Sequence, residues 1–201
     1  MDKFGNKYRI ETTRLKYWDY GSNSPYFITI CTNNREHFFG EIGDNTMYLS
    51  ESGKLAEQYW YAIPQKFSFM KLDAFIVMPN HIHGIVIIDK PNDAKTDCGG
   101  AIPCRDAINR VSNAVNGTKT NNPTTPGGIT GNKNPMLHDN LSRVVRWYKG
   151  RMTFECRKIE PSFQWQSRFY DHVIRDDKSF IKIAEYIRNN PLNWQKDKFY
   201  E

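Results

Sequence analysis

The sequence predicts an α+β fold in which helices pack on a central antiparallel sheet. Apolar, β-branched runs of strand length alternate with segments whose apolar residues recur at helical spacing. Their order is strand, helix, strand, strand, helix, strand, helix, which is typical of an α+β sandwich. A chain of 201 residues has the length of one domain with a substantial core. We therefore expect residues 1–201 to form a single domain.

The first half of the chain begins with a strand at residues 26–32, Tyr-Phe-Ile-Thr-Ile-Cys-Thr, where nearly every residue favours a pleated surface. Residues 38–42 and 46–49 are expected to form a small hairpin around Gly-Asp-Asn. Ser50 is the expected N-cap of a helix that runs to about Ile63, where a proline ends it.

The second and third strands are expected at residues 71–78 and 81–88, two apolar runs that flank a Pro-Asn turn. A helix follows from about residue 140 to residue 157, and residues 165–175 form an aromatic, β-prone fourth strand. Together these strands predict the interior of one sheet.

The last helix is expected over residues 178–190, with Asp176 or Asp177 as its N-cap and Pro191 after its end. Its apolar residues recur at helical spacing, which predicts a face buried against the sheet. With this element the order of the chain predicts a ferredoxin-like α+β sandwich.

Residues 91–138 differ from the rest, because Gly, Asn, Thr and Pro dominate and no apolar period survives. A loop of this length is unusual inside a compact domain. We therefore expect a flexible insertion that interrupts one domain without dividing it into two.

Charge and composition narrow the functional class without deciding it. The formal net charge of +6 permits nucleic-acid binding, and an ordinary basic protein remains an equal alternative. No apolar run approaches the roughly 20 residues that span a bilayer, and the N-terminus lacks the apolar core of a secretory signal. The four cysteines show no Cys-x-x-Cys spacing, so we expect reduced thiols in a cytoplasmic protein.

A pair of histidines stands at the start of the third strand. His81 and His83 are two residues apart, so on a strand both side chains point to one face and Ile82 points to the other. Two imidazoles on a rigid apolar strand can hold one metal ion. Packing or surface histidines are the alternative, although a buried histidine needs a polar partner.

The last helix carries a second set of reactive side chains. Tyr186 and Asn190 are four residues apart and therefore share one helical face. If this face meets His81 and His83, the site holds two imidazoles, an amide oxygen and a phenol. The phenol would be a nucleophile next to a cation that favours its ionised form. A tyrosine that only packs on the sheet is the alternative.

The segment Met-Pro-Asn-His-Ile-His-Gly at residues 78–84 closely resembles the His-hydrophobic-His motif of the HUH nucleases with one catalytic tyrosine. Within these, the chain resembles the REP-associated tyrosine transposases. The supporting segments are residues 26–32, residues 165–175 and Glu-Tyr-Ile with Asn-Asn-Pro at residues 185–191. Each segment alone is a weak sign of this family, whereas the combination of all of them is specific to it.

The resemblance implies a DNA transposase that cleaves and rejoins single-stranded or REP-like hairpin DNA through a 5′-phosphotyrosine, as a monomer or homodimer in the nucleoid. It assigns metal binding to His81 and His83 and the nucleophile to Tyr186. Asn190 matches the position of a third ligand, where some relatives have Gln. Mixed nitrogen and oxygen ligands suit Mg²⁺ or Mn²⁺, while zinc with a water nucleophile stays an alternative.

Several further residues are candidates for lesser roles. Tyr170 is the rival nucleophile, and His172 matches the family pattern without a definite role. Two segments carry candidate phosphate contacts: the N-terminal arm, residues 8–20, and the helix after the insertion. In both segments the alternative is that the basic side chains only face solvent. The candidate DNA-binding residues are Arg9, Arg14, Arg143, Arg146, Lys149 and Arg168.

Two other functions remain open at this stage. A protein of the same fold could grip hairpin nucleic acid without cutting it. A metal-dependent phosphohydrolase could use water on the same ligands and would form no covalent adduct.

Overall fold

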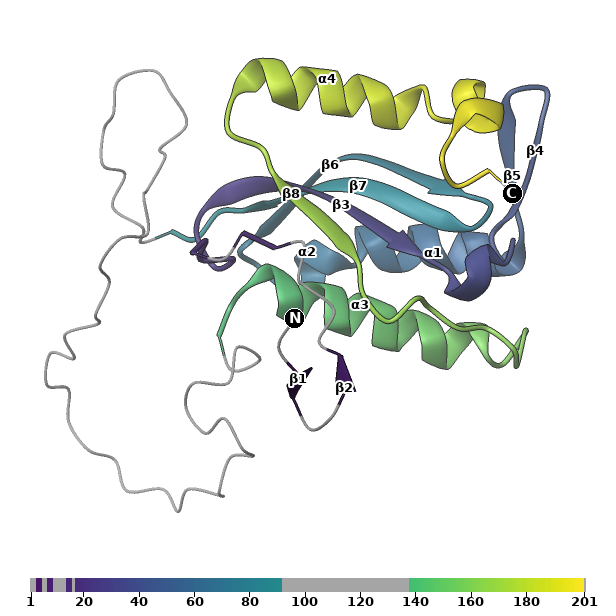
Figure 1. The fold of residues 1–201 in the computed structure, drawn as a ribbon, viewed down its shortest axis with the longest axis horizontal. Helices are drawn as coiled ribbons and strands as arrows, with labels where there is room; N and C mark the ends of the chain where they lie inside the picture. The colour runs from purple at the N-terminus through teal and green to yellow at the C-terminus, as the bar shows by residue number, and fades with distance from the viewer. Residues whose placement is uncertain (1–2, 5–6, 9–13, 16, 92–137, 201) are drawn as a thin grey trace, which may run out of the picture.

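A central sheet of four antiparallel strands organises the molecule in a computed structural model (Figure 1). The structure describes residues 3–4, 7–8, 14–15, 17–91 and 138–200. The strand order in the sheet is β6-β7-β3-β8. Their bounds are β3 Ser24–Cys31, β6 Met70–Met78, β7 His81–Ile88 and β8 Tyr170–Val173.

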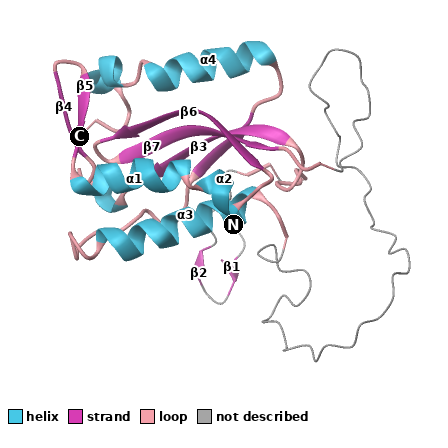
Figure 2. Ribbon diagram, turned by 180° about the vertical axis from the view of Figure 1, so that it is seen from behind, coloured by secondary structure: helices cyan, strands magenta, loops and turns pink. Residues whose placement is uncertain are grey.

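Helices cover both faces of this sheet, as Figures 1 and 2 show. Their bounds are α1 Glu51–Tyr61, α2 Ile63–Lys66, α3 Leu141–Cys156 and α4 Asp177–Arg188. α1 and α3 pack together on one face, and α4 lies alone on the other. The order β3-α1-β6-β7-α3-β8, with β3 and β7 central, confirms the predicted ferredoxin-like sandwich.

Short elements complete the described chain. They are β1 Lys3–Phe4, β2 Lys7–Tyr8, β4 Gly40–Gly43, β5 Thr46–Leu49 and the 3₁₀ segments Asn33–Arg35 and Pro191–Lys196. β4 and β5 form the predicted hairpin, whose turn places Asp44 and Asn45 at positive φ of 49° and 59°. Asx residues tolerate this conformation better than other non-glycine residues.

Helix caps follow the sequence closely. Ser50, Asn140 and Asp176 each accept a hydrogen bond from the backbone three residues later, at the starts of α1, α3 and α4. Pro64 does not end all helical structure as predicted, because a new turn, α2, begins at Ile63. Proline is tolerated there because the first turn of a helix has no internal partner for its missing N–H.

The fourth strand is shorter than predicted. Of residues 165–175 only β8 joins the sheet, paired with residues 26–29 of β3. Trp165 makes an isolated bridge with Thr32, and Gln166 donates its backbone N–H to Cys31. The chain therefore follows the end of β3 first and enters the sheet only at Tyr170.

Two hydrophobic layers hold the sandwich together. The larger lies between the sheet and the α1–α3 side, where Tyr26, Trp60 and Tyr148 are fully buried. The smaller lies under α4 and includes Ile85 and Ile187. Since side chains alternate along a strand, β7 contributes Ile82 to the first layer and Ile85 to the second.

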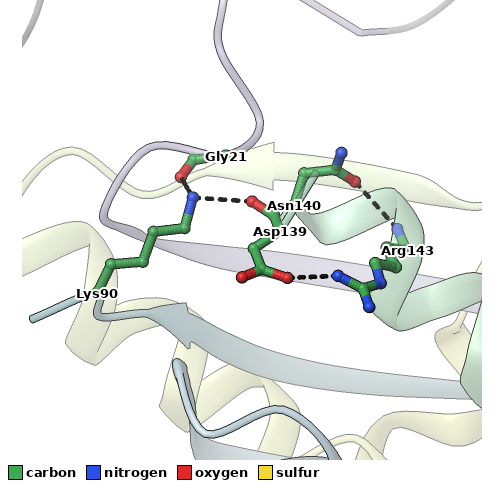
Figure 3. A network of polar contacts seen from close by, with 5 residues as sticks. All are labelled: Gly21, Lys90, Asp139, Asn140 and Arg143. Carbon is green, nitrogen blue, oxygen red and sulfur yellow. Dashed lines mark hydrogen bonds and ion pairs between the residues drawn. The ribbon is translucent and has the colours of Figure 1, made fainter. Parts of the chain in front are cut away.

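The chain leaves β7 and enters α3 at neighbouring points, which Figure 3 shows. Lys90 donates to the carbonyl oxygens of Gly21, at 2.6 Å, and Asp139, at 2.8 Å. Asp139 in turn pairs with Arg143 at 2.5 Å.

Residues 92–137, which make up nearly all of the predicted insertion, lie outside the described residues. The single domain interrupted by a flexible insertion therefore stays a prediction.

Candidate metal and tyrosine site

His81 and His83 lie on the face of β7 that α4 covers, as their spacing predicts. Both side chains are almost fully buried, with exposed fractions of 0% and 1%. Gly84, which follows them, faces the opposite layer, where a Cβ would lie 2.2 Å from Cζ2 of Trp60. The strand can therefore lie this close to α1 only because residue 84 has no side chain.

Hydrogen bonds at the Nδ1 atoms fix both imidazole rings. His81 Nδ1 lies 2.8 Å from Asn80 Oδ1, and the Asn80 amide nitrogen donates to the carbonyl of Phe199 at 2.8 Å. An amide oxygen only accepts, so His81 Nδ1 carries its proton and Nε2 presents a lone pair. His83 Nδ1 lies 2.8 Å from the Thr29 hydroxyl, which can donate or accept.

The two Nε2 atoms face each other at 3.1 Å. Burial lowers the pKa of His81 well below its usual value, and the neighbouring His83 lowers it further. Burial lowers the pKa of His83 to about 3. Both rings are therefore neutral near pH 7, and they offer adjacent nitrogens in a buried layer. This is the protonation state in which imidazole binds metals.

Tyr186 brings its hydroxyl to this pair from α4. Its Oη lies 3.3 Å from His83 Nε2, and its ring packs edge-on against Phe27. Burial raises the pKa of the phenol above 10, and the negative charge of Asp197 raises it further. The phenol is therefore neutral near pH 7, and attack by its oxygen requires removal of the proton.

Asn190 and Asp197 complete the group. Asp197 Oδ2 accepts from Asn190 Nδ2 at 3.3 Å and from the Tyr186 hydroxyl at 3.4 Å. Ligand atoms of His81, His83 and Asp197 all lie within 4.8 Å of one another. Asp197 was not expected from the sequence, because it follows a proline that ends the helix and no fixed spacing relates it to Asn190.

The donor set fits a divalent cation. Among the described residues, Asn190 Oδ1 is a buried oxygen without a hydrogen-bond partner, because Asp197 holds the nitrogen end of the amide. Two neutral imidazole nitrogens and the Asp197 carboxylate form a mixed nitrogen and oxygen set, which suits Mn²⁺ as well as Mg²⁺. A ligand role for Asn190 stays a prediction. A metal site is thus possible here.

The C-terminal segment covers the two histidines. The ring of Phe199 lies 4.5 Å from that of His81, and Trp194 lies on the same imidazole at 6.0 Å. Arg35 donates to the carbonyl of Lys198 at 3.2 Å and so fixes the segment to the end of β3. These contacts contribute to the burial of both imidazoles.

Tyr170, the rival nucleophile, lies on β8. Its side chain is 45% exposed, and its ring packs edge-on against Phe27 at 6.3 Å. Between Tyr170 and Tyr186, it is Tyr186 whose hydroxyl comes within hydrogen-bond distance of a histidine. His172 is exposed on the same strand.

The candidate DNA-binding residues fall in different parts of the molecule. Arg9 lies outside the described residues. The Arg14 guanidinium bonds Asp171 at 3.1 Å and the Ser142 hydroxyl at 2.8 Å. These contacts join the N-terminal arm to β8 and α3, which accounts for Arg14 without DNA.

The basic residues of α3 lie across the sheet from the histidines. Arg143 pairs with Asp139, and Arg146 is exposed. Lys149 donates to the carbonyl oxygens of Gln166, at 2.6 Å, and of Arg168, at 3.4 Å, so its ammonium holds the chain that leads to β8. The structure therefore does not bring these cations together with Tyr186. Their contact with DNA stays a prediction.

A sequence comparison finds two similar proteins in Haemophilus influenzae. An uncharacterized protein of Haemophilus influenzae is 36% identical over 188 residues, which are 93% of this chain and 91% of that protein. The chain belongs to the family of this protein. A second H. influenzae protein, provisionally named as a REP-associated tyrosine transposase, is 33% identical over 69 residues, 29% of this chain and 39% of that protein. No protein-family model matches the sequence.

Family membership is accompanied by a shared fold. A REP-associated tyrosine transposase, solved bound to a REP hairpin, superimposes with a TM-score of 0.55 and 16% identity over 94% of this chain and 77% of that chain. The resemblance expected from the motifs is confirmed in sequence and in fold. Within the described residues, no helix has the length and apolar character needed to cross a bilayer.

Proposed function

We propose that this protein cleaves and rejoins single-stranded or hairpin DNA as a transposase, with the Tyr186 phenol as nucleophile. The observation that carries the proposal is the position of Tyr186 Oη, 3.3 Å from His83 Nε2, where His83 and His81 face each other at 3.1 Å. A tyrosine next to a pair of imidazoles that can bind a metal is suited to nucleophilic phosphoryl transfer. The relative solved with a REP hairpin supports hairpin DNA as the partner.

In the proposed step, the phenol oxygen attacks the phosphorus of a phosphodiester and the bond from phosphorus to the 3′ oxygen breaks. One DNA end becomes a 5′-phosphotyrosine ester, and the other becomes a free 3′-hydroxyl after taking a proton from solvent. The phenol proton passes to solvent, because the nearby Asp197 carboxylate is assigned below to the proposed cation. Since the number of phosphoester bonds is unchanged, a later 3′-hydroxyl can reverse the step without ATP.

His81, His83, Asn190 and Asp197 would hold a divalent cation, which we propose is Mg²⁺ or Mn²⁺. When bound, the cation would favour the phenolate and withdraw negative charge from the phosphodiester. The side chains themselves hold the reacting groups: Phe27 supports the tyrosine ring edge-on, and Thr29 fixes the His83 ring. Such support keeps the nucleophile within reach of the histidines.

Within one protomer the Tyr186 hydroxyl reaches His83 Nε2 at 3.3 Å, which supports attack within a single protomer. A homodimer that exchanges α4 would instead join the tyrosine of one protomer to the histidines of its partner. Mixing Tyr186→Phe chains with His83→Ala chains distinguishes attack within one protomer from exchange of α4 between protomers. Action within one chain predicts no activity in the mixture, whereas exchange predicts partial recovery.

The test is a covalent-adduct assay on a labelled hairpin with single-stranded flanks, separated on a denaturing gel. We expect the wild type to form the adduct with Mg²⁺ or Mn²⁺ and to lose it in EDTA. Tyr186→Phe should abolish the adduct while DNA binding persists, and Tyr170→Phe is the matched control that should retain it. His81→Ala and His83→Ala should remove metal-dependent nicking.

Other outcomes decide between the remaining functions. Cleavage without an adduct would indicate a phosphohydrolase that uses water. Hairpin binding without cleavage under any metal would indicate a non-cleaving binding protein. An adduct that survives in Tyr186→Phe would exclude Tyr186 as the nucleophile.

A further inference from the structure

A second concave surface lies between α2 and α3, across the sheet from the histidines. It is a hollow of about 520 Å³, which we call the basic groove. Four of its lining residues are cations: Lys66, Arg143, Arg146 and Arg151. All four side chains are exposed. The proposed chemistry at Tyr186 makes no use of this surface.

The charge of the basic groove is positive throughout. Within the part of the chain that the structure describes, no acidic side chain lines it. Arg143 pairs with Asp139 and Arg151 with Glu155, at 2.5 and 3.4 Å, but both acids stand outside the lining. Both pairs are exposed, so they are weak and screened by salt, and a phosphate can compete with the carboxylate for the arginine. The surface therefore complements a polyanion.

Aromatic rings stand among these cations. Trp147 and Phe67 pack edge to face at 5.7 Å, and Phe154 is 60% exposed at the far end of the groove. The guanidinium of Arg151 lies 5.9 Å from the centre of the Phe154 ring. The open Phe154 ring beside guanidinium groups suits a strand whose phosphates are paired with cations while an unpaired base stacks on the ring. Bases inside a duplex are not available for such stacking.

Gly150 leaves space in the lining of the basic groove. A Cβ built on it would meet no atom within 4 Å, so nothing nearby requires a glycine. Glycine is also a poor residue for the middle of a helix, where it lowers the stability of α3. A larger residue at position 150 would therefore project into the basic groove without striking a neighbouring atom.

We propose that the basic groove binds an unpaired segment of the DNA strand that continues from the hairpin. The proposal rests on the proposed function for the identity of the DNA, and it adds a contact surface separate from the tyrosine site. The sequence predicted Arg143 and Arg146 as phosphate contacts. The structure adds the rings and the hollow that favour a single strand over a duplex stem.

The test compares two labelled hairpins by fluorescence anisotropy, one blunt and one with an oligothymidine tail, using the full chain in EDTA. We expect the tail to strengthen binding by wild type. Gly150→Leu fills the groove without changing charge and should remove most of this tail-dependent gain. Phe154→Ala removes an exposed ring and should reduce the gain about fivefold or more. Arg146→Ala should lower the salt dependence of tail binding by about 0.7 in log–log slope.

Lys54→Ala is the matched control, because Lys54 is an exposed cation of α1 that does not line the groove. It should keep the full tail-dependent gain. Lys54→Ala, Gly150→Leu and Phe154→Ala should bind the blunt hairpin as wild type does. If Gly150→Leu fails to fold, Phe154→Ala and Arg146→Ala, which shorten exposed side chains, still test the proposal. A tail that adds nothing in wild type, or a gain that survives in all three groove variants, would overturn the proposal. This experiment measures binding in EDTA, so its failure can be told apart from a failure to form the covalent adduct.

Discussion

Replacing Gly84 with alanine should destabilise the protein through one buried contact. The added Cβ would lie 2.2 Å from Cζ2 and 2.5 Å from Cη2 of Trp60, far inside ordinary contact distance. The indole cannot retreat easily, because it stacks on Phe75 at 4.4 Å and meets the Tyr148 ring edge-on at 5.7 Å. Overpacking of this kind costs roughly 1–3 kcal/mol. For a domain of this size that is a fall in Tm of about 2–12 °C.

Urea unfolding measures this loss, and a double-mutant cycle identifies its cause. Trp60→Phe removes the indole atoms that the new Cβ would strike, although it also leaves a cavity. The double variant should therefore be more stable than the sum of the two single changes predicts, by about 1 kcal/mol or more. Additive losses, or a Gly84→Ala protein with the wild-type midpoint, would refute the reasoning. Since His83 is the neighbouring residue, Mn²⁺ affinity should fall in Gly84→Ala and recover in the double variant.

Three further outcomes test other parts of the site. Asp197→Asn removes the one carboxylate of the proposed ligand set, so calorimetry should show Mn²⁺ binding weaker by about 10–100-fold, and unchanged affinity would exclude Asp197 from the site. Phe199→Ala removes the ring 4.5 Å from His81 and should make that imidazole react faster with diethyl pyrocarbonate; an unchanged rate would mean that the segment is already open. Burial lowers the pKa of Lys149 to about 8 from 10.5, so folding disfavours its charged form. Relative to Lys149→Met, the wild type should therefore gain stability as pH rises from about 8 to 10.5 and show a constant difference below 8; a flat difference across that window would contradict the burial.

The sequence alone determined the parts of the fold that depend on local patterns. β-branched runs fixed the strands, and Ser50 and Asp176 fixed the starts of two helices, because a cap or an alternating face needs only a few neighbouring residues. The same local rule placed His81 and His83 on one face of β7. It overextended the fourth strand, since residues 165–169 are β-prone in composition but follow the end of β3 without entering the sheet.

Only the tertiary structure decided which of these patterns meet. Packing of α4 on the histidine face brings Tyr186 within 3.3 Å of His83, whereas α3, with its arginines, packs on the opposite face. Asp197 reaches the site because the chain folds back after Pro191, which no periodicity in the sequence encodes. Contacts between distant segments depend on how buried faces fit one another, and residue spacing along the chain carries no measure of that fit.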